Sequence, residues 1–209
     1  MNNEEIPRPT HWNTVFATKG ERERSWYQKY PAASMNAIAS VRLPYDAAII
    51  DVGGGDSYLV DTLLDKGFTN VTVLDISAQA IENAKTRLGE RADLVRWIVS
   101  DITEYEPDMR FDFWHDRAAL HFLTNANDVE KYVAIAHKSI RTGGHLFLGT
   151  FSVDGPKRCS ALDVTQYSEE TMTTTVGNGF ERLWCKREDH TTPFATTQNF
   201  LFCLFRKTG

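Results

Sequence analysis

The sequence predicts an α/β fold, a doubly wound seven-stranded sheet that is mostly parallel and ends in a C-terminal antiparallel hairpin. Three observations predict it. Strand-like and helix-like segments alternate between residues 47 and 151, which is typical of a parallel sheet with helices on both faces. An apolar run that ends at Asp51 leads at once into Gly53, Gly54 and Gly55. The last two strand-like runs are joined by a turn too short for a crossover helix, so they pair antiparallel.

Length and composition fit one soluble domain. The chain has 209 residues, of which 42% are hydrophobic and 24% charged, enough for an α/β domain with a substantial core. We expect a single domain over residues 1–209. Its parts are an N-terminal helical flap or lid over 1–40, a cofactor-binding core over 47–151, and a substrate loop with the terminal hairpin over 152–209.

Charge and hydropathy narrow the partners and the location. No apolar run approaches the ~18 residues of a membrane span, and the polar, acidic start does not fit a signal peptide. We therefore expect a cytoplasmic protein with no membrane partner. A net charge of −5 without a long basic stripe disfavours a nucleic-acid partner. The histidines lack a ligand pattern such as His-Glu-x-x-His, so we expect no metal site.

Apolar periodicity, turn residues and capping residues place the individual elements. Gly67 and Gly89 suit helix ends, and Ser77 suits a helix start. Asp56 or Ser57 can cap the helix that follows the glycines. The predicted strands cover 47–52, 71–75, 94–99, 111–115, 145–151, 180–189 and 198–205, and the predicted helices cover 31–38, 57–66, 77–88, 127–141 and 168–176.

The glycine-rich turn and one acid point to a nucleotide-like ligand. Glycine lets the backbone approach a ligand closely, and the following helix start offers free N–H groups. Asp75 ends the second strand, 20 residues beyond Gly55. In a βαβ unit that strand lies beside the first, so Asp75 can accept hydrogen bonds from both hydroxyls of a ribose.

The three cysteines, Cys159, Cys185 and Cys203, show no Cys-x-x-Cys spacing. Cys185 and Cys203 are roughly equidistant from the turn around Thr192 and Pro193, so they can face each other. We expect both to be reduced core thiols, as is usual in the cytoplasm. We expect Cys159 to be a plain loop residue, with contact to a substrate as the alternative.

Several motifs along the chain resemble those of class I S-adenosylmethionine-dependent methyltransferases, in particular those of small bacterial members. The resemblance covers nearly the whole chain. It is carried by His11-Trp12-Asn13 with Ser25-Trp26-Tyr27, the glycine turn of Asp51-Val52-Gly53-Gly54-Gly55, Asp75 in Val-Leu-Asp-Ile-Ser, Ser100-Asp101-Ile102, and Arg141 to His145 before the fifth strand.

The resemblance implies S-adenosylmethionine as cofactor and a role for each matching residue. Gly53, Gly54 and Gly55 would line the methionine moiety, and Asp75 would bind the ribose. Ile76 and Ile102 would pack beside adenine, Asp101 would accept from the adenine amino group, His115 would lie near the sulfonium, and Trp26 would belong to a lid.

Alternative interpretations stay open for some of these residues. Gly54 can serve the turn alone, Asp101 can cap a loop, and Asp51 can hold the loop without touching the ligand. Trp12 and Trp26 can be core anchors as well as lid residues. The rival cofactor is NAD, but Tyr58 stands where the Gly-x-Gly-x-x-Gly motif has its third glycine.

The implied reaction is direct displacement at a methyl carbon, which requires alignment and exclusion of water. His115 or His121 can act as general base, although His121 can also only pack. Arg117 or Arg158 can hold an anionic substrate, or Arg117 can pair with Asp116.

The expected acceptor is a small molecule. The chain has neither an Asn- or Asp-Pro-Pro-Tyr motif after the fourth strand nor a Pro-Cys nucleophile, and its pI is acidic. The alternatives are a protein lysine methyltransferase and a binding protein without catalysis.

Overall fold

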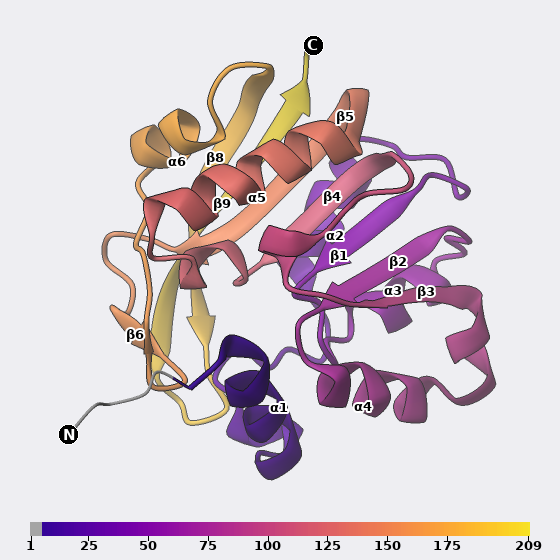
Figure 1. Cartoon of the computed structure of the whole chain (residues 1–209), viewed down its shortest axis with the longest axis vertical. Helices are drawn as coiled ribbons and strands as arrows, with labels where there is room; N and C mark the ends of the chain where they lie inside the picture. The colour runs from indigo at the N-terminus through magenta and orange to yellow at the C-terminus, as the bar shows by residue number, and fades with distance from the viewer. Residues whose placement is uncertain (1–5) are drawn as a thin grey trace.

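A computed structural model describes residues 6–209 of the chain (Figure 1). Its main sheet has the order β3-β2-β1-β4-β5-β9-β8. The strands are β1 (Ile49–Val52), β2 (Val71–Asp75), β3 (Val95–Val99), β4 (Phe111–Arg117), β5 (Ile140–Phe151), β8 (Phe180–Thr191) and β9 (Thr197–Lys207), and a separate small hairpin pairs β6 (Arg158–Cys159) with β7 (Leu162–Asp163). The helices are α1 (Arg8–Thr18), α2 (Ala32–Ser40), α3 (Leu59–Asp65), α4 (Ala78–Leu88), α5 (Ala126–Ser139) and α6 (Glu169–Val176).

The predicted fold class is confirmed. Strands β1 to β5 are parallel, and β9 runs antiparallel between β5 and β8. The strand order reverses direction between β1 and β4, and ligands of open α/β sheets bind in the crevice at such a switch point. In that register Val52 lies opposite Asp116, so Gly53 and Arg117 leave the sheet side by side.

Two hydrophobic clusters cover the two faces of the sheet. Side chains of α5 and α6, among them Tyr132 and Met172, pack on one face, and those of α2 and α3, among them Ile38 and Leu63, pack on the other. Figure 1 shows α5 crossing in front of the sheet and α1 lying beside α4. Within residues 6–209, no helix combines the length and apolar character that crossing a membrane requires.

Local sequence signals explain most helix boundaries. Ser77 is the N-cap of α4, as predicted, and its hydroxyl accepts the Ala80 N–H. Ser168 caps α6 in the same way, through the Thr171 N–H. Helix α3 differs, because it begins at Leu59 after Tyr58 without a side-chain cap. Asp56 does not cap it, since its carboxylate is bound to Arg24.

Helix α5 ends two residues earlier than predicted, and β5 begins before the glycines instead of after them. Ile140 already pairs with Phe111, and pairing resumes with His145 opposite Phe113. The intervening residues bulge out of the ladder, with Gly143 at a φ of 81°. Gly143 therefore serves a bulge inside a strand and not a helix end.

The expectation of two reduced thiols in the terminal hairpin is wrong. Cys185 on β8 lies opposite Cys203 on β9 in the antiparallel register, and the structure joins them in a disulfide. The predicted facing position was right. Their Cα atoms are 4.1 Å apart, the close spacing of a pair without ladder hydrogen bonds, and this proximity brings the two sulfur atoms into bonding range.

The carboxyl end of β4 is held by a buried polar network. Asp116 accepts from the backbone N–H groups of Ala119 and Leu120, at 2.8 and 3.0 Å. Tyr132 on α5 donates its hydroxyl to Asp116 Oδ2 (2.7 Å) and accepts from Trp114 Nε1 (3.0 Å). Burial raises the pKa of Asp116 to about 6, against the opposing effect of these bonds.

We predict that Tyr132→Phe destabilises the protein by about 1–3 kcal/mol, because it leaves the buried Asp116 and Trp114 groups short of a partner. Urea unfolding measures the change. Tyr105→Phe is the matched control, since the Tyr105 hydroxyl is buried without a hydrogen-bond partner among residues 6–209 and its loss should cost almost nothing. Equal stability of the two variants would contradict the network.

Candidate active site

A cavity of about 110 Å³ lies at the carboxyl ends of the strands, beside the switch point. It gathers residues that follow β1, β2, β3 and β4, together with side chains of the N-terminal segment. Its walls include Arg8, Trp12, Phe16, Trp26, Gly53, Asp75, Ile76, Asp101, Ile102, Arg117, Ala119, His121, Phe122, Phe151, Cys159 and Phe200. A smaller pocket beside it is lined by Asp51, Gly53, Gly54, Ser57, His115 and Arg117.

The glycine turn is shaped by close contacts that a side chain would break. Gly53 has a φ of 64°, and a Cβ there would lie 2.5 Å from the Ala119 Cβ. A Cβ on Gly55, at a φ of 51°, would lie 3.2 Å from both Asp75 Oδ2 and the ring of Phe16. The turn therefore fits tightly between the loop after β4 and the end of β2.

Asp75 is buried at the end of β2, where one of its oxygens accepts the Ser77 N–H at 2.7 Å. Burial raises the pKa of Asp75 to about 7, and the charges of Asp51 and Asp56 add to this effect. The hydrogen bonds from Ser77 and Gly55 act in the opposite direction. Asp75 thus borders the cavity as a carboxyl group with a raised pKa. Hydrogen bonds donated by the hydroxyl groups of a ligand would favour its ionised form.

Asp101, Ile76 and Ile102 border the cavity on the side of β2 and β3. Asp101 Oδ1 accepts from the backbone and side chain of Thr103, as the loop-capping alternative predicts. Its Oδ2 pairs with Arg8 of α1 at 3.1 Å. Arg8 also contacts Asp128 at 3.3 Å, so the start of α1 is tied to both neighbouring elements.

Aromatic side chains of the N-terminal segment cover the cavity. The ring of Trp12 contacts that of Phe122, with centroids 4.8 Å apart, and it lies 6.0 Å from Trp26. Asn13 fixes the position of α1, since its Oδ1 accepts from Ser77 Oγ and from the Gln79 N–H. Trp12 and Trp26 therefore pack as anchors and also form a wall of the cavity.

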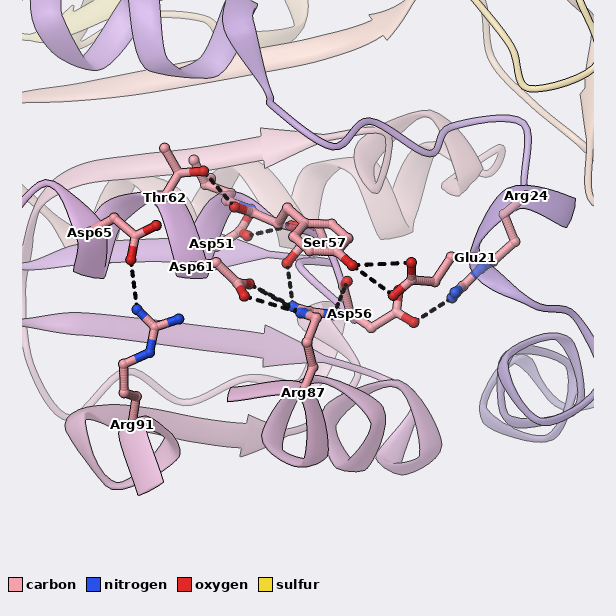
Figure 2. A network of polar contacts seen from close by, with 12 residues as sticks. Glu21, Arg24, Asp51, Asp56, Ser57, Asp61, Thr62, Asp65, Arg87 and Arg91 are labelled. Carbon is pink, nitrogen blue, oxygen red and sulfur yellow. Dashed lines mark hydrogen bonds and ion pairs between the residues drawn. The ribbon is translucent and has the colours of Figure 1, made fainter. Parts of the chain in front are cut away.

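Polar contacts fasten the rest of this segment to the glycine turn and α3 (Figure 2). Arg24 and Asp56 form a buried ion pair at 2.7 Å. The Tyr58 hydroxyl donates to Glu21 at 3.0 Å, and the Tyr58 ring is flanked by Lys29 and Arg87. The residue that replaces the third glycine of a dinucleotide motif thus anchors the N-terminal segment.

His115 is buried, and both of its ring nitrogens are engaged within the protein. Nδ1 lies 2.6 Å from Asp51 Oδ1, and Nε2 lies 2.8 Å from Ser34 Oγ of α2. The ring also stacks on Phe147, with centroids 5.3 Å apart. In this arrangement neither nitrogen is free to take a proton from a substrate, which argues against the expected role as general base.

The side chains of Arg117 and Asp116 project from opposite faces of β4, so the two do not pair. Its Nη2 donates to the Trp26 carbonyl at 3.2 Å. Among residues 6–209 no carboxylate lies within ion-pair distance of its guanidinium, and burial lowers the pKa of Arg117. The cavity therefore holds a guanidinium with hydrogen-bond donors to spare.

The remaining candidate site residues from the sequence, His121, Cys159 and Arg158, lie on the side of the site near β5 and β9. His121 is fully buried and borders the cavity, as does the free thiol of Cys159. Burial raises the pKa of Cys159. Arg158 is exposed and pairs with Asp163 across its own hairpin at 2.9 Å, so it does not reach the cavity.

Sequence reasoning missed Arg8, Ser34 and α1 itself. The spacing of Trp12, Val15 and Phe16 is helical, and Pro7 stands just before α1 as a start signal. These cues could have revealed the helix. Nothing local could have revealed Ser34, because its partner His115 is 81 residues away.

Comparison with known proteins relates the central part of the chain to methyltransferases. Residues 50–146 match the model of a methyltransferase domain. Malonyl-[acyl-carrier protein] O-methyltransferase 2 of Ilyobacter polytropus is 27% identical over 107 residues, which cover 51% of this chain and 40% of that protein. The mouse eEF1A lysine and N-terminal methyltransferase is 25% identical over 141 residues, 64% of this chain and 20% of that protein. The chain thus matches less than half of each relative.

Solved structures share the fold at low sequence identity. A protein studied for the conversion of a disulfide bond into a thioacetal group during echinomycin biosynthesis gives a TM-score of 0.76 at 17% identity, covering 96% of this chain and 93% of its own. The 1,6-didemethyltoxoflavin-N1-methyltransferase of Burkholderia thailandensis, solved with its substrate and S-adenosylhomocysteine, gives 0.65 at 23% identity, covering 87% and 78%.

Residues 50–146, a little under half of the chain, thus match a methyltransferase domain, and the chain as a whole shares its fold with S-adenosylmethionine-dependent methyltransferases. Two similar solved structures contain S-adenosylhomocysteine, which agrees with the cofactor S-adenosylmethionine that the resemblance implied.

We predict that Gly53→Ala destabilises the protein by about 2 kcal/mol or more, because it adds a left-handed alanine and a clash with Ala119. Urea unfolding measures the loss. Adding Ala119→Gly removes the clash but not the backbone strain, so the double variant should recover only part of the stability. A single variant as stable as the parent protein would contradict the close approach.

Proposed function

We propose that this protein transfers a methyl group from S-adenosylmethionine to a small-molecule acceptor held in the cavity at the switch point. The observation that carries the proposal is the single cavity that runs from Asp75 and Asp101, beside β2 and β3, to His121 and Phe151, beside β4 and β5. One part has the groups for a nucleoside, and the other has an apolar wall. We therefore place the cofactor against the first part and the methyl acceptor against the second, at the tip of β4.

The residues fit the cofactor part by part. A buried carboxyl group, Asp75, matches the paired hydroxyls of a ribose, and Asp101 Oδ2 can accept from an adenine amino group. Ile76 and Ile102 supply apolar contact for the base. Gly53 leaves room for the amino-acid tail, because the cavity borders its bare backbone.

Arg117 completes this site as the partner of the methionine carboxylate. It lines both the main cavity and the small pocket beside Gly54, and its donors have no acidic partner among residues 6–209. A guanidinium binds a carboxylate through two parallel hydrogen bonds. His115 has a supporting role, because it orients Asp51 below the turn.

When bound, S-adenosylmethionine supplies an electrophilic methyl group. The protein contributes alignment and exclusion of water. Both histidines near the reacting centre have their acceptor nitrogens engaged, and burial raises the pKa of the Cys159 thiol. The atom that takes the methyl group therefore brings its own lone pair, as a neutral amine or a ring nitrogen does.

Two features favour a small acceptor over a protein lysine. The part of the cavity near β5 and β9 is lined by Phe122, Phe151, Cys159 and Phe200, and among the described residues there we find no carboxylate to receive an ammonium group. The aromatic wall of Trp12 and Trp26 also covers it. The relatives that methylate eEF1A keep the protein acceptor as the alternative.

Incubation with methyl-labelled S-adenosylmethionine and an extract of the producing cells tests the acceptor. We expect label in the small-molecule fraction, and much less of it with Asp75→Asn, which should bind the cofactor poorly. Label in protein bands would support the alternative and contradict the proposed acceptor class. Cofactor binding without any transfer would indicate a binding protein.

We predict that S-adenosylhomocysteine binds more weakly as the pH falls below about 7. The ribose hydroxyls donate to ionised Asp75, whose pKa in the free protein is about 7, so binding displaces a proton. The Kd should rise about tenfold per pH unit below that value and be flat above pH 8.

Calorimetry in two buffers of different ionisation heat measures the released proton. Asp75→Asn should flatten the pH profile and weaken binding by roughly 10- to 100-fold. Asp101→Asn is the matched control, since it should weaken binding but keep the slope. A wild-type profile that stays flat down to pH 5.5 would remove Asp75 from the site.

We predict that Arg117→Met weakens S-adenosylhomocysteine binding by roughly 10- to 100-fold, the range for a lost charged hydrogen bond. 5′-Methylthioadenosine lacks the amino-acid tail, so its Kd should not change. Arg117→Lys should recover part of the affinity, because it keeps the charge without the bidentate geometry. Equal losses for both ligands would show that Arg117 only supports the fold.

A further inference from the structure

His121 lies at the end of the cavity away from the residues assigned to the cofactor. It belongs to the short turn Leu120–Phe122 after β4 and is fully buried. Its ring packs between Phe122 and Phe151, with each centroid 4.6 Å away. The ring thus forms part of the apolar wall while carrying two polar nitrogens.

The hydrogen bonds of the ring fix its tautomer. The backbone N–H of Phe151 donates to Nδ1 at 3.2 Å, so Nδ1 carries no proton. Burial lowers the pKa of His121 to about 3, and the ring is neutral at physiological pH. A neutral imidazole bears one proton, which must then sit on Nε2.

Nε2 has no hydrogen-bond partner among residues 6–209. The Nδ1 edge faces the backbone of β5, Phe151 lies tilted against the ring and Phe122 meets it at 78°. We infer from this that the remaining Nε2 edge is the one directed to the cavity that His121 borders. A buried N–H without a partner costs free energy, and proteins rarely leave one so. This donor is available to a ligand and cannot act as a base.

We propose that His121 is a specificity residue that donates its Nε2–H to an uncharged hydrogen-bond acceptor, a carbonyl oxygen or a ring nitrogen, on the methyl-accepting substrate, remote from the atom that takes the methyl group. The proposal rests on the proposed function, because it places the substrate beside the cofactor. It defines the substrate class: a compact, uncharged, largely apolar molecule whose methyl-accepting atom faces the cofactor and which carries a second polar atom at the remote end.

The physical reason for selectivity is the lone donor. A ligand that fills this end without an acceptor atom leaves the N–H unpaired in an apolar wall, whereas a ligand with one satisfies it. The discrimination between two such ligands of the same shape should be roughly 5- to 100-fold in Kd, the range that an unpaired buried donor implies.

The test uses 1-indanone and indane, which differ in one carbonyl oxygen. Both are titrated into the full chain saturated with S-adenosylhomocysteine, and their Kd values are measured by NMR. Long-range ¹H–¹⁵N spectra of the imidazoles give a second readout. We expect the Nε2–H tautomer of His121 in the free protein, tighter binding of indanone, and a downfield shift of the Nε2 proton when indanone binds.

Two variants separate the donor from the fold. His121→Asn keeps an oxygen near the position of Nδ1 for the Phe151 N–H but removes the Nε2 donor, so the preference for indanone should vanish. His121→Gln places an amide N–H near Nε2 and should restore part of it. His145→Asn, on β5 away from the cavity, is the matched control and should keep the full preference.

The outcomes distinguish the two proposals. No binding of S-adenosylhomocysteine at all would overturn the proposed function. Normal cofactor binding with equal affinity for indanone and indane, or an Nδ1–H or doubly protonated His121 at pH 7, would overturn the role of His121 alone. Preference retained in His121→Asn would do the same.

Discussion

The hydrogen bond between His115 and Asp51 joins the two strands between which the order of the sheet reverses. The rest of the site depends on it. Asp51 Oδ2 lies 2.6 Å from where a Cβ of Gly54 would be, so this carboxylate, one residue before the end of β1, sets the path of the turn. Ser34 holds the far side of the imidazole and fixes α2 over the same point. A polar network in the core thus positions a backbone surface that a ligand can approach.

Neighbouring side chains at the end of β4 point to opposite faces of the sheet and make different contacts. Asp116 points toward α5 and ties down the loop that carries Ala119, while Arg117 points to the other face and into the cavity. Because side chains of a strand alternate between faces, neighbouring residues serve stability and recognition separately. Ala118 follows with a φ of 74°, an uncommon conformation for alanine, which the Asp116 contacts sustain.

The fold and the residues that gather at the β2 and β3 end of the cavity were predictable because their signals are local. The glycine turn, the strand that ends at Asp75 and the cap at Ser77 each lie within a few residues of sequence. The hydrogen bonds of His115 and His121 were not predictable, because each depends on a partner that is distant in sequence, Ser34 for one and the backbone of Phe151 for the other. The disulfide was not predicted for a related reason, since its formation depends on the three-dimensional register of β8 and β9.

Arg8 has a consequence for cofactor exchange. With Asp101 assigned to adenine, Arg8 and the adenine amino group address the same carboxylate oxygen, Oδ2. The docking of α1 and the binding of a nucleoside are then coupled, and each changes the free energy of the other by the same amount. Because Arg8 is partly exposed, salt screens its ion pair with Asp101. A higher ionic strength therefore weakens the docking of α1 and makes its displacement by a nucleoside easier.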